Sequence, residues 1–283
     1  MDKHLFELDL SWFAGISLIQ ERVAERLYAD QNIGSENPPP ASISVVVPTY
    51  QEASNLGPLI CRINKAMSSR SIGYEIIVVD DNSRDGTDEV IDHLVSLDSP
   101  VRLITRIDER GLSSAVIRGF EASRGEFLVC MDGDLSHQPE AISQLLDCFA
   151  DPEVDLALGS RYVSGSTTDE DWGFFRWLNS KVATLLALPF TPVKDPMSGF
   201  FAIRRDVFSK ASSLLNPVGY KIGLELMVKC KWRKIVEIPI HFADRQSGRS
   251  KLTFGERIKY LKHLIRLASF KYQVFARQKF HSF

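Results

Sequence analysis

The amino-acid sequence predicts an α/β fold in which helices cover both faces of a mostly parallel, twisted β-sheet. Short apolar stretches alternate with amphipathic ones between residues 43 and 160, and this alternation is typical of β-α-β units. Several of the apolar stretches are hydrophobic on both faces, as strands inside a sheet are. The 283 residues are 44% hydrophobic, which is enough for one large domain with appendages.

The strands and helices are expected in alternating order along the chain. Apolar stretches predict the strands, and apolar residues three or four positions apart predict the helices. The expected strands cover residues 43–47, 74–80, 101–105, 127–131 and 156–160. The helices between them are expected at 55–67, 87–97, 112–122 and 139–149. After residue 165 the pattern loosens, with helices expected at 174–188 and 220–231 and strands at 199–204 and 235–242.

Three parts of the chain are expected. Residues 3–29 predict an amphipathic helix, and a loop with prolines at 38–40 follows it. We therefore expect an N-terminal helix and linker at 1–41, a main domain at 42–252 and a basic tail at 253–283. The N-terminus lacks the basic and apolar regions of a signal peptide, and no run of about 18 apolar residues predicts a membrane-spanning helix. The main domain is therefore expected to face the cytosol.

Two carboxylates directly follow one of the expected buried strands. The strand at 127–131 runs into Asp132-Gly133-Asp134, and open α/β sheets bind ligands at the carboxyl ends of their strands. Two hard oxygen ligands one residue apart suit Mg²⁺ or Mn²⁺, which complete their coordination with phosphate and water. Because Asp and Gly are also common in turns, the alternative interpretation is an ordinary polar loop.

Polar side chains also follow the other expected strands, at 48–52, 80–87 and 159–162. Parallel strands bring these ends together, and an aromatic ring, carboxylates and an arginine suit a nucleotide diphosphate. Plainer interpretations exist, since Asp85-Gly86 also begins helices and Arg161 alone suggests a surface ion pair. No Gly-x-Gly-x-x-Gly motif follows a strand and no P-loop is present, which argues against an NAD enzyme and a P-loop NTPase.

Charge is unevenly distributed along the chain. The net charge is −2, but residues 249–283 contain nine Lys or Arg and one acid, Glu256. Such a tail suggests an anionic partner such as a membrane, a nucleic acid or an acidic protein. On a helical wheel Ile258, Leu261, Leu264, Ile265, Ala268, Tyr272 and Phe275 form an apolar face, opposite Lys259, Lys262, His263 and Arg266. This pattern predicts a helix at an anionic leaflet, and a helix packed on the main domain or on a membrane subunit is the alternative.

Several motifs resemble those of family 2 glycosyltransferases with a GT-A fold. They lie at 48–52 (Pro-Thr-Tyr-Gln-Glu), 80–87 (Asp-Asp-Asn-Ser-Arg-Asp-Gly-Thr), 110–112 (Arg-Gly-Leu) and 132–139 (Asp-Gly-Asp-Leu-Ser-His-Gln-Pro). Later motifs, at 159–162, 195–201, 219–221 and 245–252, are similar to those of dolichol-phosphate (polyprenol-phosphate) mannosyltransferases. The resemblance covers residues 42–272. It implies a metal-dependent enzyme that transfers mannose from GDP-mannose to a dolichyl or polyprenyl phosphate.

The resemblance also implies roles for individual residues, position by position. The nucleoside of GDP-mannose would be held by Pro48, Tyr50, Glu52 and Asp81, with Asp80 nearby. The metal ion, Mg²⁺ or Mn²⁺, and the diphosphate would lie at Asp132, Gly133, Asp134 and Ser136. The phosphates would be clamped by Arg161, Arg245 and Lys251, the last two on a loop that can close. The lipid phosphate would meet Arg161, Arg176 and Ser180, the last two one helical turn apart.

The sequence departs from the family pattern at four of its positions. Gln51 stands where Asn is usual, and Lys181 and Thr184 replace the commoner Arg and Asn. Ser136 stands where many members have Gln, which puts a side-chain metal contact there in doubt. None of these changes removes an expected charge.

The acceptor determines the expected mechanism. A phosphate monoester, with a second pKa of about 6, is already a nucleophilic dianion at neutral pH and needs no general base. A single displacement with inversion would give a β-linked product. Asp134 and the cations Arg161, Arg176, Arg245 and Lys251 would assist it by charge stabilisation and screening.

Three alternatives remain open from the sequence. The donor could be UDP-glucose or another nucleotide sugar, or the acceptor could be a glycan hydroxyl with Asp195 or Glu225 as the base. The third alternative is a non-catalytic binding protein of the same fold. The protein is expected to lie peripherally at the cytoplasmic face of a membrane, on the lipid itself or on a small anchor subunit, with no nucleic-acid partner.

Overall fold

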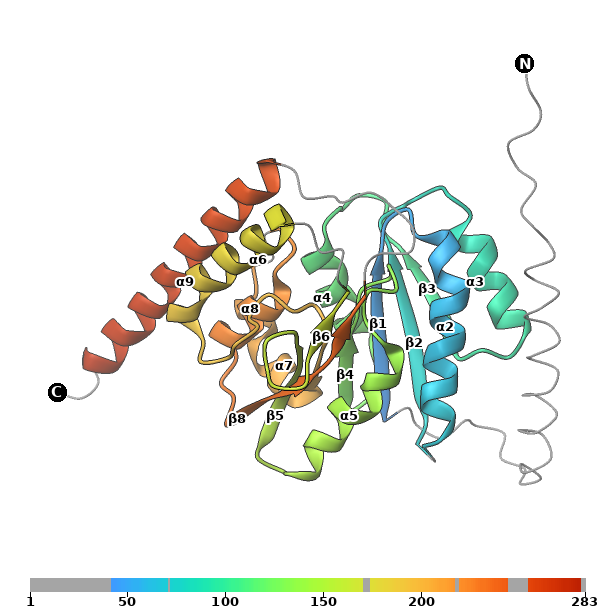
Figure 1. Cartoon of the computed structure of the whole chain (residues 1–283), viewed down its shortest axis with the longest axis horizontal. Coiled ribbons are helices and arrows are strands. Elements are labelled where there is room, and N and C mark those ends of the chain that lie inside the picture. The colour runs from blue at the N-terminus through green and yellow to red at the C-terminus, as the bar shows by residue number, and fades with distance from the viewer. Residues whose placement is uncertain (1–41, 71, 170–173, 217–218, 244–253, 281–283) are drawn as a thin grey trace, which may run out of the picture. The chain divides into compact units, whose positions relative to one another are not determined.

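A seven-stranded β-sheet forms the centre of the described structure, with strands in the order β3-β2-β1-β4-β7-β5-β8 (Figure 1). The strands are β1 Ile43–Thr49, β2 Tyr74–Asp80, β3 Val101–Thr105, β4 Phe127–Cys130, β5 Val154–Ser160, β7 Phe201–Arg204 and β8 Lys234–Pro239. β7 runs antiparallel to β4 and β5, whereas the other neighbouring strands are parallel. This arrangement confirms the predicted α/β fold with a mostly parallel sheet.

The structure is a computed structural model that describes residues 42–70, 72–169, 174–216, 219–243 and 254–280. The chain divides into two compact units, residues 1–39 and residues 40–283. All of the described residues belong to the second unit, so the helix predicted at 3–29 lies outside them.

The helices largely follow the predicted order. They are α2 Ala53–Ser68, α3 Thr87–Ser96, α4 Leu112–Ala122, α5 Ile142–Asp147, α6 Phe174–Ala187, α7 Arg205–Ala211, α8 Ile222–Lys229 and α9 Phe254–Phe280. Short 3₁₀ turns are found at Pro139–Ala141, Cys148–Ala150, Leu188–Phe190 and Ser212–Leu214. A second, two-stranded parallel sheet consists of β6 Thr167–Thr168 and β9 His241–Phe242.

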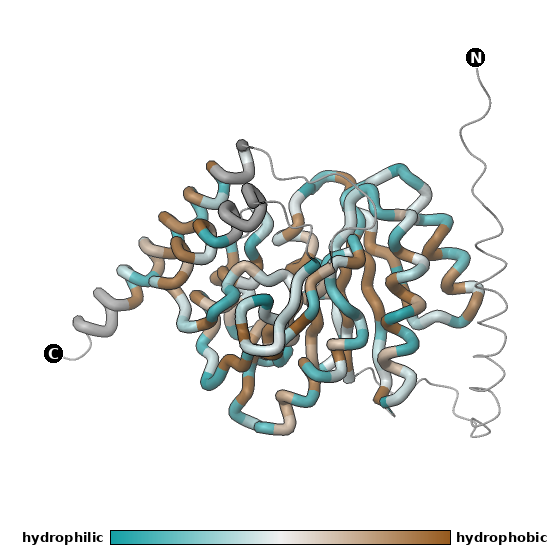
Figure 2. The backbone as a smooth tube through the Cα atoms, in the orientation of Figure 1, coloured by the Kyte–Doolittle hydropathy of each residue, from teal (hydrophilic) through white to brown (hydrophobic). Residues whose placement is uncertain are grey.

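The two faces of the large sheet form separate apolar cores. Successive residues of β1 alternate between them, as the pleat of a strand requires. Val45 packs in the core that includes α2, α3 and α5, and Val46 packs in the core that includes α4, α7 and α8. Figure 2 shows the central strands as predominantly hydrophobic, which agrees with burial on both faces.

Two predicted elements are wrong in detail. The helix predicted at 139–149 is reduced to α5, because 3₁₀ turns replace its first and last residues, as often happens at helix ends. The strand predicted at 235–242 is divided at Pro239, which has no N–H to donate to a strand ladder. Beyond this proline the chain continues as β9, which pairs with β6 instead of with the large sheet.

The long helix α9 packs on the rest of this unit through one face. Tyr260, Leu264 and Leu267 are buried in a third apolar cluster with residues of α6 and α8. His263, expected on the solvated face, is also buried, because it contacts Glu225 of α8. Most of the predicted apolar face remains exposed, including Ile265, which is 66% exposed. No helix in the described part of the chain is both long enough and apolar enough to cross a membrane.

Candidate active site

The carboxyl ends of β1, β2, β4 and β5 meet at one edge of the sheet, because these strands run in the same direction. The loops that follow the first three are tightly turned. Gln51, Asn82, Arg84 and Leu135 have φ angles between 53° and 62°, in the left-handed region that non-glycine residues rarely adopt. Such backbone conformations cluster at functional sites, which supports the interpretation of this edge as a site.

Direct contacts place these loops side by side. The Asp81 N–H donates to the Thr49 carbonyl at 3.1 Å, which joins the ends of β1 and β2. A Cβ atom on Gly133 would lie 3.1 Å from Cγ2 of Thr49. A Cβ atom on Gly199 would lie 3.2 Å from the Asp132 carboxylate, so this glycine makes room for the carboxylate. The structure therefore brings the predicted nucleoside and metal residues to one continuous edge.

Asp132 and Asp134 follow β4 and differ in exposure. Asp134 is buried and its Oδ1 accepts the Ser136 N–H at 3.1 Å, whereas the Asp132 side chain is 30% exposed. The Ser136 hydroxyl is buried without a hydrogen-bond partner among the described residues. An unsatisfied buried hydroxyl costs about 1–3 kcal/mol, which favours a bound group that satisfies it. Two carboxylates and a hydroxyl are hard oxygen donors, and this set fits Mg²⁺ or Mn²⁺.

His137 supports the same loop and was not among the predicted site residues. Its Nδ1 accepts the Asp132 backbone N–H at 3.2 Å, and its ring stacks on Phe200 with centroids 5.3 Å apart. Burial lowers the pKa of His137, although the charges of Asp132 and Asp134 oppose this effect. The ring is therefore neutral at neutral pH, with its proton on Nε2 because Nδ1 is the acceptor. The sequence signal was its place in the motif that begins at Asp132.

Arg161, directly after β5, forms a buried ion pair with Asp195. Its Nε and Nη2 donate to the two carboxylate oxygens at 2.8 Å each, and its backbone N–H donates at 3.0 Å. Burial alone would raise the pKa of Asp195, but the hydrogen bonds and charge of Arg161 hold it below its ordinary value. Asp195 is therefore an ionised partner that orients Arg161, as bidentate carboxylates do for guanidinium groups.

Lys221, just before α8, is a further cation at this edge that was not among the predicted site residues. Its Nζ donates to the carbonyl of Met197 at 3.2 Å and lies 4.5 Å from the centroid of the Tyr220 ring. Burial lowers the pKa of Lys221 to about 8, and the charge of Arg161 acts in the same direction. Asp132 and Asp195 act in the opposite direction, which indicates that Lys221 belongs to the same charge cluster.

Asp80 and Asp81, around the end of β2, are both bonded to neighbouring protein groups. The Asp80 carboxylate accepts the Ser83 N–H at 2.7 Å. The Asp81 carboxylate accepts hydrogen bonds from the Arg106 guanidinium and, at 2.7 Å, from the Gly111 N–H. Arg106 lies in the loop after β3, which is highly charged in sequence and gives no sign that one of its arginines is buried.

The remaining predicted nucleoside residues lie at the end of β1. Pro48 belongs to the strand itself. The Tyr50 hydroxyl lies 3.4 Å from Nη1 of Arg110, whose guanidinium is 5.1 Å from the centroid of the tyrosine ring. Glu52 is buried at the start of α2, and its Oε2 accepts a hydrogen bond from Nδ2 of Asn55 at 2.7 Å.

Four predicted site residues cannot be compared with this geometry. Arg245 and Lys251 lie in the stretch 244–253, outside the described residues. Arg176 and Ser180 belong to α6, whose backbone is described, but their side chains lie outside the described part of the structure. Their roles stay predictions.

The sequence is similar to those of known glycosyltransferases. The profile described as "Glycosyl transferase family 2" matches residues 44–211. A dolichol-phosphate mannosyltransferase of Mycosarcoma maydis is 44% identical over 237 residues, which cover 82% of this chain and 80% of that protein. A dolichol-phosphate mannosyltransferase of Saccharomyces cerevisiae is 41% identical over 236 residues, which cover 81% of this chain and 88% of that protein.

The fold is also found in a solved glycosyltransferase structure. Glucosyl-3-phosphoglycerate synthase from Mycobacterium tuberculosis, in complex with Mn²⁺ and UDP-glucose, matches with a TM-score of 0.55. The match covers 81% of this chain and 78% of that chain at 19% identity, so it bears on the fold alone. Together with the family profile and the relatives, it identifies the large sheet and its helices as a GT-A-like fold. The chain is a glycosyltransferase that belongs to glycosyl transferase family 2 and, within it, to the dolichol-phosphate mannosyltransferases.

Proposed function

We propose that this protein transfers a mannosyl residue from GDP-mannose to dolichyl or another polyprenyl phosphate, with inversion at the anomeric carbon and with Mg²⁺ or Mn²⁺ bound. The observation that carries the proposal is the 44% identity to a relative named for mannosyl transfer to dolichol phosphate. This similarity extends over 82% of the chain. The buried charges at the carboxyl edge of the sheet support it.

Asp132, Asp134 and Ser136 would hold the metal ion. No group of three or more His, Cys, Asp or Glu side chains suited to a metal ion occurs among the described residues. Water and the donor phosphates would therefore complete the coordination, as is usual for Mg²⁺. When bound, a divalent ion neutralises charge on the departing diphosphate. The structural neighbour in complex with Mn²⁺ and UDP-glucose supports a site of this kind.

Asp195 and Glu225, the two carboxylates considered as general bases for a hydroxyl acceptor, are each paired with a cationic side chain. Asp195 is fully buried in its pair with Arg161. Glu225 is also fully buried, and its Oε1 accepts Nζ of Lys229 at 2.6 Å. Burial would raise the pKa of Glu225, but His263 and Lys229 hold it below its ordinary value. A phosphate acceptor needs no base, because it is a dianion at neutral pH, so these observations favour a lipid phosphate over a glycan hydroxyl.

Transfer between two phosphates needs positive charge to screen them from each other. Arg161 and Lys221 supply such charge from β5 and from the start of α8. We expect further charge from Arg176, Arg245 and Lys251, and a hydroxyl from Ser180, whose placement lies outside the described residues. These groups would align the acceptor phosphate with the anomeric carbon, and alignment alone contributes strongly to such reactions.

A membrane surface is the partner that we expect to present the lipid. α6 and α9 are neighbours, because the Tyr260 hydroxyl donates to the Ala183 carbonyl at 2.7 Å. Exposed large apolar side chains described on these two helices are Val182, Leu185, Leu186, Ile258, Leu261, Ile265, Tyr272 and Val274. Lys259, Lys262 and Arg266 on α9 are exposed as well, which suits an anionic leaflet. A small membrane anchor subunit is the alternative occupant of this face.

Lipid extraction after incubation with labelled donors tests the proposal. The protein is incubated with radiolabelled GDP-mannose or UDP-glucose, a polyprenyl phosphate in liposomes, and Mg²⁺, Mn²⁺ or EDTA. We expect labelled lipid from GDP-mannose only when metal is present, and a β-linked mannosyl group by NMR. Asp134→Asn should reduce the rate by about 100-fold or more, the scale of a lost electrostatic contact in an active site.

The matched control is Asp151→Asn, a partly exposed carboxylate at the opposite end of β5 that pairs with Lys234. Its rate should equal that of the wild type. No labelled lipid from either donor would contradict the proposed reaction. Label from UDP-glucose alone would contradict the donor, and an α-linked product would contradict inversion.

A further inference from the structure

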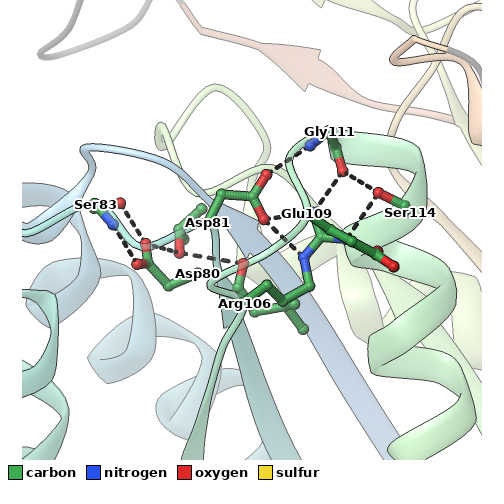
Figure 3. Close-up of polar contacts among 9 residues, drawn as sticks. Asp80, Asp81, Ser83, Arg106, Glu109, Gly111 and Ser114 are labelled. Carbon is green, nitrogen blue, oxygen red and sulfur yellow. Dashed lines mark hydrogen bonds and ion pairs between the residues drawn. The ribbon is translucent and has the colours of Figure 1, made fainter.

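Arg106 is a buried arginine whose donors are distributed among groups around the end of β2 and the start of α4 (Figure 3). It is only 7% exposed, although it lies in the loop that follows β3. Its Nε donates to Oδ1 of Asp81 at 2.7 Å, and Nη2 donates to the same oxygen. Nη1 donates to the Ser114 hydroxyl at 2.7 Å, and Nη2 also donates to the Gly111 carbonyl at 2.9 Å. A contact with the exposed Glu109 completes the network, at 3.2 Å.

This network determines the orientation of the Asp81 carboxylate and the number of its free acceptor positions. Oδ1 of Asp81 accepts two hydrogen bonds from Arg106, and Oδ2 accepts one from the Gly111 N–H at 2.7 Å. A carboxylate has about four acceptor positions, so three are used by the protein and one remains on Oδ2. Because both oxygens are bound, the carboxylate cannot rotate without breaking a buried charged contact. Asp81 therefore offers one acceptor position in one orientation.

The loop that carries Arg106 also contacts Tyr50. Arg106 N–H donates to the Asp80 carbonyl at 2.8 Å, which ties the start of the loop to β2. Gly111 ends the loop with φ +141°, a conformation that other residues rarely adopt. Between these two fixed ends, Arg110 lies over the Tyr50 ring at 5.1 Å. Arg106 thus holds both Asp81 and the loop that carries Arg110.

We propose that Arg106 is a positioning residue that sets nucleotide selectivity, by restricting Asp81 to a single acceptor position for one N–H or O–H group of a nucleoside diphosphate. The inference rests on the proposed function, which assigns the donor nucleoside to Asp81 and Tyr50. Without Arg106 only the Gly111 N–H holds the carboxylate, through Oδ2, and Oδ1 can then accept donors from other directions. Nucleotides that differ in the placement of their donors would then bind with more similar affinity.

Arg106→Lys tests the inference, since lysine keeps the charge but lacks the planar guanidinium fork that donates to Asp81, Ser114 and Gly111 at once. Dissociation constants for GDP and UDP are measured by calorimetry on the full chain, and donor kinetics are measured with polyprenyl phosphate. We expect the nucleotide that the wild type prefers to bind at least tenfold more weakly, and the other to change less than threefold. The donor KM should rise while kcat at saturating donor stays within about twofold.

Arg102→Lys is the matched control. Arg102 lies on β3 itself and pairs with Glu75 of β2 at 3.1 Å, but at the opposite ends of these two strands from Arg106 and Asp81. This variant should leave the ratio of the two dissociation constants unchanged. Equal weakening of GDP and UDP binding by Arg106→Lys, or a lower kcat at unchanged KM, would overturn the inference, because a merely structural residue would act in that way.

A second variant keeps the test decisive if Arg106→Lys does not fold. Ser114→Ala removes one hydrogen bond to Arg106 and leaves the pair with Asp81 in place. We expect a two- to fivefold rise in donor KM with kcat unchanged, and no change in KM would overturn the inference. Wild-type protein that binds neither nucleotide and transfers no sugar would instead contradict the proposed function, so the two failures are distinguishable.

Discussion

Charged side chains lie at the edge of the sheet where the carboxyl ends of β1, β2, β4 and β5 meet, called the active edge below. They orient one another before any substrate binds. The two oxygens of Asp195 orient Arg161 through one side-chain hydrogen bond each, and two donors of Arg106 orient Asp81 through one oxygen, Oδ1. Groups that are already oriented need no reorganisation when charge develops, which is the main source of electrostatic catalysis. Lys221 differs from them, because burial lowers its pKa to about 8 and the side chain therefore loses its positive charge as the pH rises through this value.

A prediction at the residue scale concerns the pH dependence of activity. The pKa of Lys221 is lowered to about 8, so the residue is charged below this pH and loses its proton as the pH rises through it. If its charge helps to hold the phosphates, kcat/KM for the donor should fall above pH 8, since this ratio reports the free enzyme. Lys221→Arg, which stays charged, should abolish the fall. The exposed Lys231→Arg should retain it, and an unaltered profile in Lys221→Arg would exclude this role.

A buried cluster of charged and polar side chains connects helices α8 and α9. Glu225 of α8 is fully buried, and its Oε1 accepts both Nζ of Lys229 and the Asn216 N–H at 2.6 Å. His263 of α9 lies 3.2 Å from the other oxygen, without the geometry of an aligned hydrogen bond. A buried ion pair rarely adds stability over an apolar one, but removal of one partner is costly. The cluster therefore specifies where α9 docks.

A prediction at the scale of elements follows from this cluster. Glu225→Gln keeps the shape but leaves Lys229 and His263 without their carboxylate, and should lower the free energy of unfolding by about 3 kcal/mol. Chemical denaturation measures this change. Activity per folded molecule at low temperature should remain close to that of the wild type, because Glu225 is not at the active edge. The exposed Glu121→Gln should be neutral, and an equal effect of the two variants would refute the docking role.

At the scale of the whole described unit, the neighbouring helices α6 and α9 both carry exposed apolar side chains. Exposed apolar residues of this size are scattered singly on most proteins, whereas contiguous ones mark interaction sites. Leu261 and Ile265 are 51% and 66% exposed and lie one turn apart on α9. A lipid-linked acceptor makes a membrane the expected partner of this surface.

Vesicle binding tests this expectation. The double variant Leu261→Asp/Ile265→Asp should weaken co-sedimentation with phosphatidylserine-containing vesicles at least tenfold, since each buried leucine or isoleucine contributes about 1.5–3 kcal/mol. Leu97→Asp, a comparably exposed leucine after α3, is the control and should bind vesicles like the wild type. If the double variant binds vesicles as well as the wild type does but its oligomeric mass in solution differs, the surface contacts a protein partner instead of a membrane.

The sequence predicted the parts of the site that depend on local pattern. Strands that are apolar on both faces end at polar residues, and parallel topology then requires those residues to share one edge. Asp80, Asp132 and Arg161 were found in this way, and the structure brings the loops that carry them together. The placement of Arg106 and Lys221 at this edge was not predicted, because a charged loop and a lone lysine look solvent-exposed when only their neighbours in sequence are considered.

Hydrophobic alternation and the residues at strand ends, both local properties of the chain, predicted the α/β fold and a polar site at one edge of the sheet. The family and the roles of individual residues came from the resemblance of the chain's motifs to those of known glycosyltransferases. Only the tertiary structure decided that β7 runs antiparallel between β4 and β5 and that β9 pairs with β6. It also decided which charges are buried, such as Arg106 against Asp81 and His263 against Glu225. Burial and partner choice depend on contacts between residues far apart in sequence, and no local pattern contains that information.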